Sequence, residues 1–263
     1  MDLRLRGRVA LVAASSKGLG RAIAEELAAE GTALVVCSRN ADQIRAAATD
    51  ISRSHGVEVV GVAADISKPA DVEMLLRQCQ NSFGQIDILV TNAGGPPPGA
   101  FETHSAERWQ QAFELTFASA VNLVRGVLPG MKERRWGRII CVTSIAAKQP
   151  VDSLILSNAM RPAVTGFART LANEVATFGI TVNCMLPGFT RTERVEQIAE
   201  SNAKSLGASV EQVRAIWEEQ IPMRRLGEAR EFAALAAFLA SERASYITAQ
   251  SIAVDGGWIR SLL

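Results

Sequence analysis

The chain has 263 residues, of which 48% are hydrophobic and 21% are charged. Its 28 basic and 27 acidic side chains almost cancel, which argues against a basic nucleic-acid-binding surface or an acidic tail. The ordinary content of glycine (20) and proline (9) excludes collagen-like and disordered classes, and the length allows a large buried core. The chain has a single tyrosine and only two histidines.

The N-terminal segment resembles a signal peptide only in part. Its arginines precede an apolar run over residues 9–14, which is shorter than a secretory core and leads into a Ser-Ser-Lys-Gly segment. Nowhere does the chain approach the run of about 18 apolar residues that a membrane span requires. The four cysteines are far apart and form no CxxC pair, so we expect neither a disulfide framework nor a metal site. The sequence predicts a cytoplasmic protein without membrane or nucleic-acid partners.

Short β-branched runs alternate with segments of helical periodicity. The strand-like runs cover residues 8–13, 33–37, 57–63, 86–90, 138–142 and 180–186. They are almost continuously apolar, as is typical of a parallel sheet covered on both faces. Between them, Leu19, Ile23 and Leu27 repeat every four residues, and Pro69 precedes a second helical pattern. The alternation predicts a doubly wound, Rossmann-like α/β fold in a single domain over residues 1–263.

One long polar segment, residues 190–226, breaks this alternation. In a doubly wound sheet, ligands bind at the carboxyl ends of the strands. We therefore expect this segment to form a flap beside the ligand site.

A glycine-containing turn follows the first strand-like run and leads directly into the first helix. Glycines let the backbone approach a pyrophosphate, and a helix N-terminus supplies free N–H groups. Ala14 stands where the dinucleotide fingerprint has its first glycine, an exchange compatible with binding if Ala14 keeps a negative φ. The turn predicts cofactor-binding residues at Ser15, Ser16, Lys17, Gly18, Leu19 and Gly20.

The end of the second strand indicates which dinucleotide is bound. An NAD-binding chain carries an acidic residue about 20 residues after the turn. Here the segment reads Cys37-Ser38-Arg39-Asn40, and Arg39 together with Lys17 supplies two cations for a 2′-phosphate. We expect NADP(H) in preference to NAD(H), with Ser38 and Arg39 at the site; the alternative is that both cations are solvated surface charges.

Several ordered motifs carry a resemblance to a known family. They are Ser-Lys-Gly-Leu-Gly (16–20), Ala-Asp-Ile (64–66), Asn-Ala-Gly (92–94), Ser144, Pro-Gly (187–188) and Val-Asp-Gly-Gly (254–257). Over essentially its full length, the chain resembles the short-chain dehydrogenases/reductases, and among them the 3-oxoacyl-carrier-protein reductases. The resemblance implies a homo-oligomer, a tetramer or dimer. It also implies contacts with adenine, ribose and nicotinamide: Asp65 and Ile66; Asn92, Ala93 and Gly94; Pro187, Gly188 and Thr192.

The catalytic motif departs from the family's pattern. The family normally uses Asn, Ser, Tyr and Lys, and the Tyr of its YxxxK motif stands thirteen residues after the Ser and protonates the carbonyl oxygen. Thirteen residues after Ser144 stands Ser157, followed four residues later by Arg161, and the asparagine position falls on Thr116. The chain therefore resembles a divergent subgroup with SxxxR, and Ser144, Ser157, Arg161 and Thr116 are its candidate catalytic residues.

These exchanges change the chemistry available. A serine hydroxyl is shorter and far less acidic than a phenol of pKa ~10, so Ser157 cannot donate a proton as tyrosine does. Arg161 stays protonated and can hold ribose hydroxyls, a phosphate or a substrate carboxylate with its planar fork. Lys148 and Asp152 are alternative proton donors, or else solvated loop charges. Tyr246 lies far along the chain and is expected to be structural.

Three functions fit these observations. The first is a divergent NADP(H)-dependent oxidoreductase that reduces a carbonyl, or oxidises an alcohol, on a small-molecule or acyl substrate. The alternative is a catalytically impaired NADP(H)-binding or regulatory protein, because three of the four catalytic positions are replaced. The third is a lyase or isomerase without net redox chemistry, since a fold does not fix a function.

Overall fold

The structure, a computed structural model, describes residues 2–262. Within them, one parallel sheet has the strand order β3-β2-β1-β4-β5-β6-β7. The strands are β1 Val9–Val12, β2 Ala33–Ser38, β3 Val59–Ala63, β4 Ile88–Thr91, β5 Gly137–Val142, β6 Ile180–Pro187 and β7 Ser251–Val254. The six predicted runs correspond to β1–β6 within a few residues. The strand order reverses between β1 and β4, and ligands bind in the crevice beyond such a reversal.

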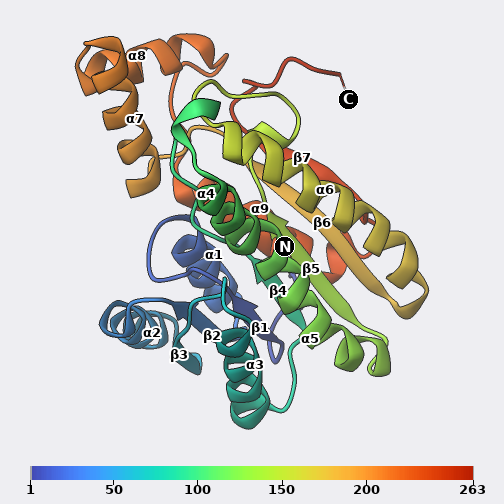
Figure 1. Cartoon of the computed structure of the whole chain (residues 1–263). Coiled ribbons are helices and arrows are strands. Elements are labelled where there is room, and N and C mark those ends of the chain that lie inside the picture. Colours follow the sequence, from blue (N-terminus) through green and yellow to red (C-terminus); the bar gives the residue numbers. More distant parts are fainter. Residues whose placement is uncertain (1, 263) are drawn as a thin grey trace.

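Helices cover both faces of the sheet (Figure 1). Their bounds are α1 Gly18–Ala29, α2 Ala41–His55, α3 Pro69–Phe83, α4 Ala106–Phe113, α5 Ser119–Glu133, α6 Ile155–Val175, α7 Glu193–Leu206, α8 Val210–Gln220 and α9 Ala229–Ala240. The two helices predicted from the apolar repeat over residues 19–27 and from the pattern after Pro69 are α1 and α3. The doubly wound, single-domain α/β fold is confirmed.

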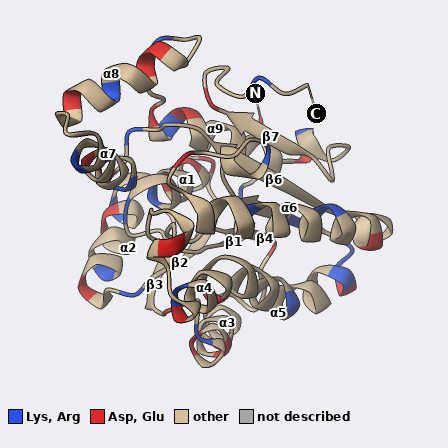
Figure 2. Ribbon diagram, turned by 45° about the horizontal axis from the view of Figure 1, so that its top comes forward, with Lys and Arg blue, Asp and Glu red and all other residues tan. Residues whose placement is uncertain are grey.

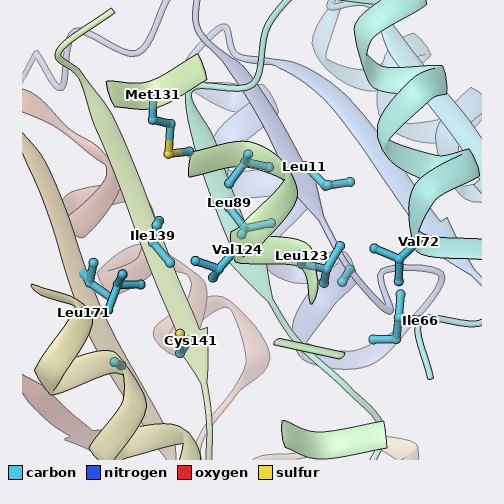
Figure 3. Close-up of a cluster of buried hydrophobic side chains, with 14 of the residues drawn as sticks. Leu11, Ile66, Val72, Leu89, Leu123, Val124, Met131, Ile139, Cys141 and Leu171 are labelled. Carbon is cyan, nitrogen blue, oxygen red and sulfur yellow. The ribbon is translucent and has the colours of Figure 1, made fainter. Parts of the chain in front are cut away.

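Two apolar layers hold the helices to the sheet. On one face, Leu11, Leu89 and Ile139 pack against α3, α5 and α6, and Figure 3 shows Leu123 and Val124 of α5 above these strands. The other face packs against α1, α2 and α9. Because successive strand residues point to opposite faces, a strand buried on both sides is apolar at every position. Each large side chain buried in this way stabilises the fold by about 1.5–3 kcal/mol.

Charged residues of both signs are spread over the outer helices (Figure 2). In the part of the chain that the structure describes, no helix is long and apolar enough to cross a membrane. The four cysteines are unpaired and buried. The charged side chains thus lie on the outer surfaces of the helices, whereas the strands contribute to the buried core.

The predicted flap is an ordered helical pair. Residues 190–226 form α7 and α8, which project beside the carboxyl ends of the strands (Figure 1). The two helices share a small core of their own, in which Trp217 is buried and stacks on Phe189 at 4.5 Å between ring centroids. The flap is therefore a preformed wall of the ligand crevice.

Candidate active site

Asn92 and Gly20 fix the turn after β1. Asn92, just after β4, donates hydrogen bonds from Nδ2 to the carbonyl oxygens of Ala13 and Ala14, at 3.3 and 3.2 Å. A Cβ on Gly20 would collide with the Ala14 oxygen, so only glycine fits there. Ala14 has φ +47°, so the negative φ that was set as the condition for an alanine in a binding turn is not met. These contacts hold the alanine in the left-handed region, which costs a non-glycine residue about 1–2 kcal/mol.

The N-terminus of α1 can receive a phosphate group. Its N-cap residue, Lys17, makes no side-chain cap hydrogen bond, and Gly18 follows with φ +61°. The N–H groups of the first helical turn are therefore not satisfied by a capping side chain, and the helix dipole favours an anion there. Both features fit the pyrophosphate of a dinucleotide.

Two residues predicted to bind the cofactor have a structural role instead. Ser15 is fully buried, and its Oγ donates to the Val12 carbonyl at 2.7 Å and accepts from the Cys37 N–H at 3.2 Å. Gly20 is buried against Ala14. Neither lines the cavity. Ser15 and Gly20 fix the shape of the turn, and the residues between them, 16–19, line the cavity.

The other predicted cofactor residues meet in one cavity of about 810 Å³, at the carboxyl ends of the strands. Its lining joins the turn after β1, the ends of the following strands and the start of α7. The predicted residues among it are Ser16, Lys17, Gly18, Leu19, Ser38, Arg39, Asp65, Ile66, Asn92, Ala93, Gly94, Pro187, Gly188 and Thr192. This volume lies within the usual range of ligand pockets, about 300–1,000 Å³.

The two cations predicted for a 2′-phosphate have different surroundings. Arg39 is exposed at the cavity edge and has no salt bridge within residues 2–262. Lys17 Nζ instead lies 2.5 Å from a carboxylate oxygen of Glu193 on the flap. Both partners of that pair are more than half exposed, and exposed pairs contribute little to stability. Arg39 is thus the cation available to a phosphate, whereas Lys17 links the turn to α7.

The candidate catalytic serines and Arg161 border the same cavity. Ser144 follows β5 and begins a short 3-10 turn, where its Oγ accepts from the Ala146 N–H at 3.1 Å. Ser157 and Arg161 stand four residues apart on α6 and are 7% and 6% exposed. No protein hydrogen bond of the Ser157 hydroxyl occurs within residues 2–262. Its hydroxyl remains available to a ligand.

Within residues 2–262, Arg161 is a buried cation without a carboxylate partner. Nη1 donates to the Val142 carbonyl at 3.0 Å and Nη2 to the Ala93 carbonyl at 3.4 Å, whereas Nε has no hydrogen-bond partner among the described residues. Burial, together with the positive charge of Arg194, lowers the pKa of Arg161 to about 10. The guanidinium is still charged at neutral pH, as predicted.

The remaining candidates lie outside the cavity. Thr116 is buried in a π-helical turn (Glu114–Ala118), and its Oγ1 has no hydrogen-bond partner in the part of the chain that the structure describes. It does not line the cavity, and neither do Lys148 and Asp152, both exposed. Tyr246, expected to be structural, is instead fully exposed. The structure therefore brings together only three of the four catalytic candidates.

Arg194 is a cavity residue that sequence reasoning missed. The flap showed no decisive pattern, but the second residue of α7 is an arginine, at a helix end where the dipole disfavours a cation. Its Nη2 donates to the Pro96 carbonyl at 2.5 Å, and a Cβ on Gly95 would lie 2.8 Å from the same nitrogen. Two features of the sequence could have indicated this residue: an arginine in the first turn of a helix and a glycine at position 95.

Comparison with known proteins identifies the family to which the chain belongs. A family model described as enoyl-(acyl carrier protein) reductase matches residues 13–259. The NADPH-dependent reductase BacG of Bacillus subtilis is 34% identical over 97% of this chain and 99% of its own. The chain belongs to the short-chain dehydrogenase/reductase family. It is an oxidoreductase of that family.

Other short-chain dehydrogenases/reductases are equally similar. The 3-oxoacyl-[acyl-carrier-protein] reductase FabG of Escherichia coli is 33% identical, over 97% of this chain and 98% of its own. The crystal structure of L-sorbose reductase from Gluconobacter frateurii, complexed with NADPH and L-sorbose, superposes with a TM-score of 0.94 at 36% identity, over 100% of both chains. The predicted family resemblance, including that to the 3-oxoacyl-carrier-protein reductases, is confirmed.

Proposed function

We propose that this chain is an NADP(H)-dependent reductase of a carbonyl group on a small-molecule or acyl substrate. The observation that carries the proposal is the convergence of Ser144 and Ser157 on the cavity that also contains the glycine turn. The names of relatives support it: BacG is an NADPH-dependent reductase, and FabG is a 3-oxoacyl-[acyl-carrier-protein] reductase.

The cavity residues fit NADP(H). The uncapped N-terminus of α1 and Gly18 would hold the pyrophosphate, and Arg39 with Ser38 the 2′-phosphate. Asp65 accepts from the Ser67 N–H and hydroxyl, which fixes the loop that would flank the adenine. When bound, the cofactor would supply the hydride, and the protein's own groups would orient and polarise the substrate.

The two serine hydroxyls would orient the substrate. Each can donate a hydrogen bond to the carbonyl oxygen, and the charge of Arg161 stabilises the negative charge that develops on that oxygen. A serine hydroxyl is too weak an acid to deliver the proton itself. We infer that the proton comes from water through the hydroxyls, so that turnover is slower than with a tyrosine donor.

A second candidate is an NADP(H)-binding protein without turnover. It is favoured by the exchange of the tyrosine and lysine positions for Ser157 and Arg161. A lyase or isomerase reaction is the third possibility, and no observation favours it. The homo-oligomeric state and the cytoplasmic location stay predictions.

The deciding experiment combines binding and turnover. Calorimetric titration with NADPH and NADH measures the cofactor preference, and NADPH consumption is then followed with a panel of ketones, oxo acids and acyl thioesters. Saturable consumption of one NADPH per alcohol formed supports the reductase. Tight NADPH binding with no consumption on the whole panel supports the second candidate, and product formation without NADPH oxidation supports the third.

A further inference from the structure

Two arginines face the cavity without a carboxylate partner. Arg161 and Arg194 both line it together with Ser144 and Ser157. Within residues 2–262, neither guanidinium has an acidic side chain within 4 Å. Their hydrogen bonds go only to backbone carbonyls, those of Val142, Ala93 and Pro96. Buried charges are normally paired, so the buried Arg161 and the partly buried Arg194, both without an acidic partner, require an explanation.

The two cations also lie within electrostatic reach of each other. The charge of Arg194 contributes to lowering the pKa of Arg161, and burial lowers the pKa of Arg194 itself. Like charges that share a desolvated site repel, and Arg161 Nε, on a side chain only 6% exposed, is left without an acceptor. An anion bound beside the two guanidinium groups would offset this repulsion.

Arg194 is held in place at a cost to its own helix. It stands in the first turn of α7, where a cation is opposed by the helix dipole. The guanidinium packs on the backbone at Gly95, where an added Cβ would lie 2.8 Å from Nη2. Contacts between the flap and the loop after β4 therefore hold the guanidinium of Arg194 at the cavity, although its positive charge destabilises the first turn of α7.

We propose that Arg161 and Arg194 bind a carboxylate of the substrate, so that the substrates of this reductase are oxo acids rather than neutral ketones or aldehydes. The proposal rests on the reductase function above. The planar guanidinium fork matches a carboxylate with two parallel hydrogen bonds. The cofactor's own phosphates are the competing source of an anion, and they have a separate place at the N-terminus of α1.

The first test measures binding rather than turnover. Acetate, 4-phenylbutanoate and decanoate, and the neutral amide of each, are titrated calorimetrically into protein saturated with NADPH. We expect at least one acid to bind tenfold or more tightly than its amide. Arg194→Gln should weaken the binding of that acid about 10- to 100-fold, as expected for the loss of a charge-assisted hydrogen bond. The affinity for the amide should be unchanged. Arg194→Lys should be intermediate.

Arg191→Gln is the matched control. Arg191 lies three residues away on the same flap, is half exposed, pairs with Glu218 and Glu228, and does not line the cavity. This variant should bind acid and amide as the wild type does. Equal affinity for acid and amide throughout the panel overturns the proposal. So does an Arg194→Gln variant that loses NADPH affinity tenfold with the acid-to-amide ratio intact, because the anion would then be a cofactor phosphate.

A turnover arm separates this inference from the function on which it rests. The wild type should reduce 2-oxo-4-phenylbutanoate with a kcat/KM at least tenfold above that for its ethyl ester, and Arg194→Gln should abolish the difference. If neither compound is reduced but acid binding still depends on Arg194, the reductase function fails and the anion site stands. If the ester is reduced as well as the acid, the reductase stands and the anion site fails.

Discussion

Ser157 and Arg161 lie one helical turn apart on α6, both buried and both lining the cavity that Ser144 borders. They occupy the positions where the family's pattern has tyrosine and lysine. A hydroxyl without useful acidity thus replaces the proton donor, and a permanent cation replaces the lysine. In the proposed mechanism the pair orients and polarises a carbonyl, and water supplies the proton.

Removing the first serine should impair turnover without affecting the cofactor. We expect Ser144→Ala to lower kcat at least tenfold, because one donor to a developing oxyanion contributes about 10²–10³ in rate. The calorimetric Kd for NADPH should stay within twofold. Ser205→Ala, on the exposed side of α7, serves as the control. Full activity of Ser144→Ala would remove this residue from the mechanism.

Restoring the family's pattern should accelerate the reaction. The double variant Ser157→Tyr/Arg161→Lys regains a phenol beside an ammonium group, and general acid catalysis typically contributes about 10²–10⁴ in rate. We expect a kcat at least tenfold above the wild type with a neutral ketone. The measurement is NADPH consumption on a variant whose melting temperature matches the wild type. No gain in such a variant would show that proton delivery does not limit turnover.

The sequence was most informative where a pattern has one physical solution. Continuous apolar runs are buried on both faces, so they predicted β1–β6 and the sheet. The positive φ of Ala14 was less predictable, because the carbonyl of Ala14 is held by Asn92, which lies 78 residues away in the chain. The place of Arg194 was unpredictable for the same reason, since it depends on how the flap meets the loop at Pro96. The conformation of Ala14 and the position of Arg194 depend on contacts between segments that are far apart in the chain, and the spacing of residues in the sequence does not reveal such contacts.

The preference for NADPH should depend on Arg39. It is exposed at the cavity edge and unpaired within residues 2–262, so a 2′-phosphate is its natural partner. Measured by calorimetry, Arg39→Gln should weaken NADPH binding about tenfold or more and leave the affinity for NADH unchanged. Arg45→Gln, which removes a cation paired with Asp42 on α2, should change neither affinity. Equal loss of both cofactors would argue against 2′-phosphate recognition.

Relieving the strained turn should stabilise the protein. Ala14→Gly removes the left-handed strain at φ +47° but adds freedom to the unfolded chain, and these opposing effects are each about 1 kcal/mol. We expect the free energy of unfolding in urea to rise by up to ~1 kcal/mol, with NADPH affinity retained. A loss of more than ~1 kcal/mol would mean that the Ala14 methyl group contributes packing that outweighs its strain.

Glu231 should make stability fall at acid pH. Its carboxylate accepts two hydrogen bonds from Arg225, at 2.6 and 2.8 Å, and one from the Glu228 N–H, which lowers its pKa to about 2. Because the unfolded chain binds this proton more readily, the stabilisation is present above about pH 4.5 and is lost as the pH falls toward 2.

Urea midpoints at pH 6, 4 and 3 check this sign. The midpoint of the wild type should fall more steeply with acid than that of Glu231→Gln, and the two curves should converge. Glu133→Gln, at an exposed position at the end of α5, should follow the wild type. A Glu231→Gln curve parallel to the wild type would contradict the account.

The most direct test of the central account is NADPH oxidation by the wild type and Ser144→Ala with the same oxo-acid substrate. The account predicts saturable oxidation by the wild type, one alcohol formed per NADPH consumed, and a rate at least tenfold lower for the variant with unchanged NADPH binding. Tight NADPH binding by both proteins, with no oxidation by either on any carbonyl of the panel, would contradict it.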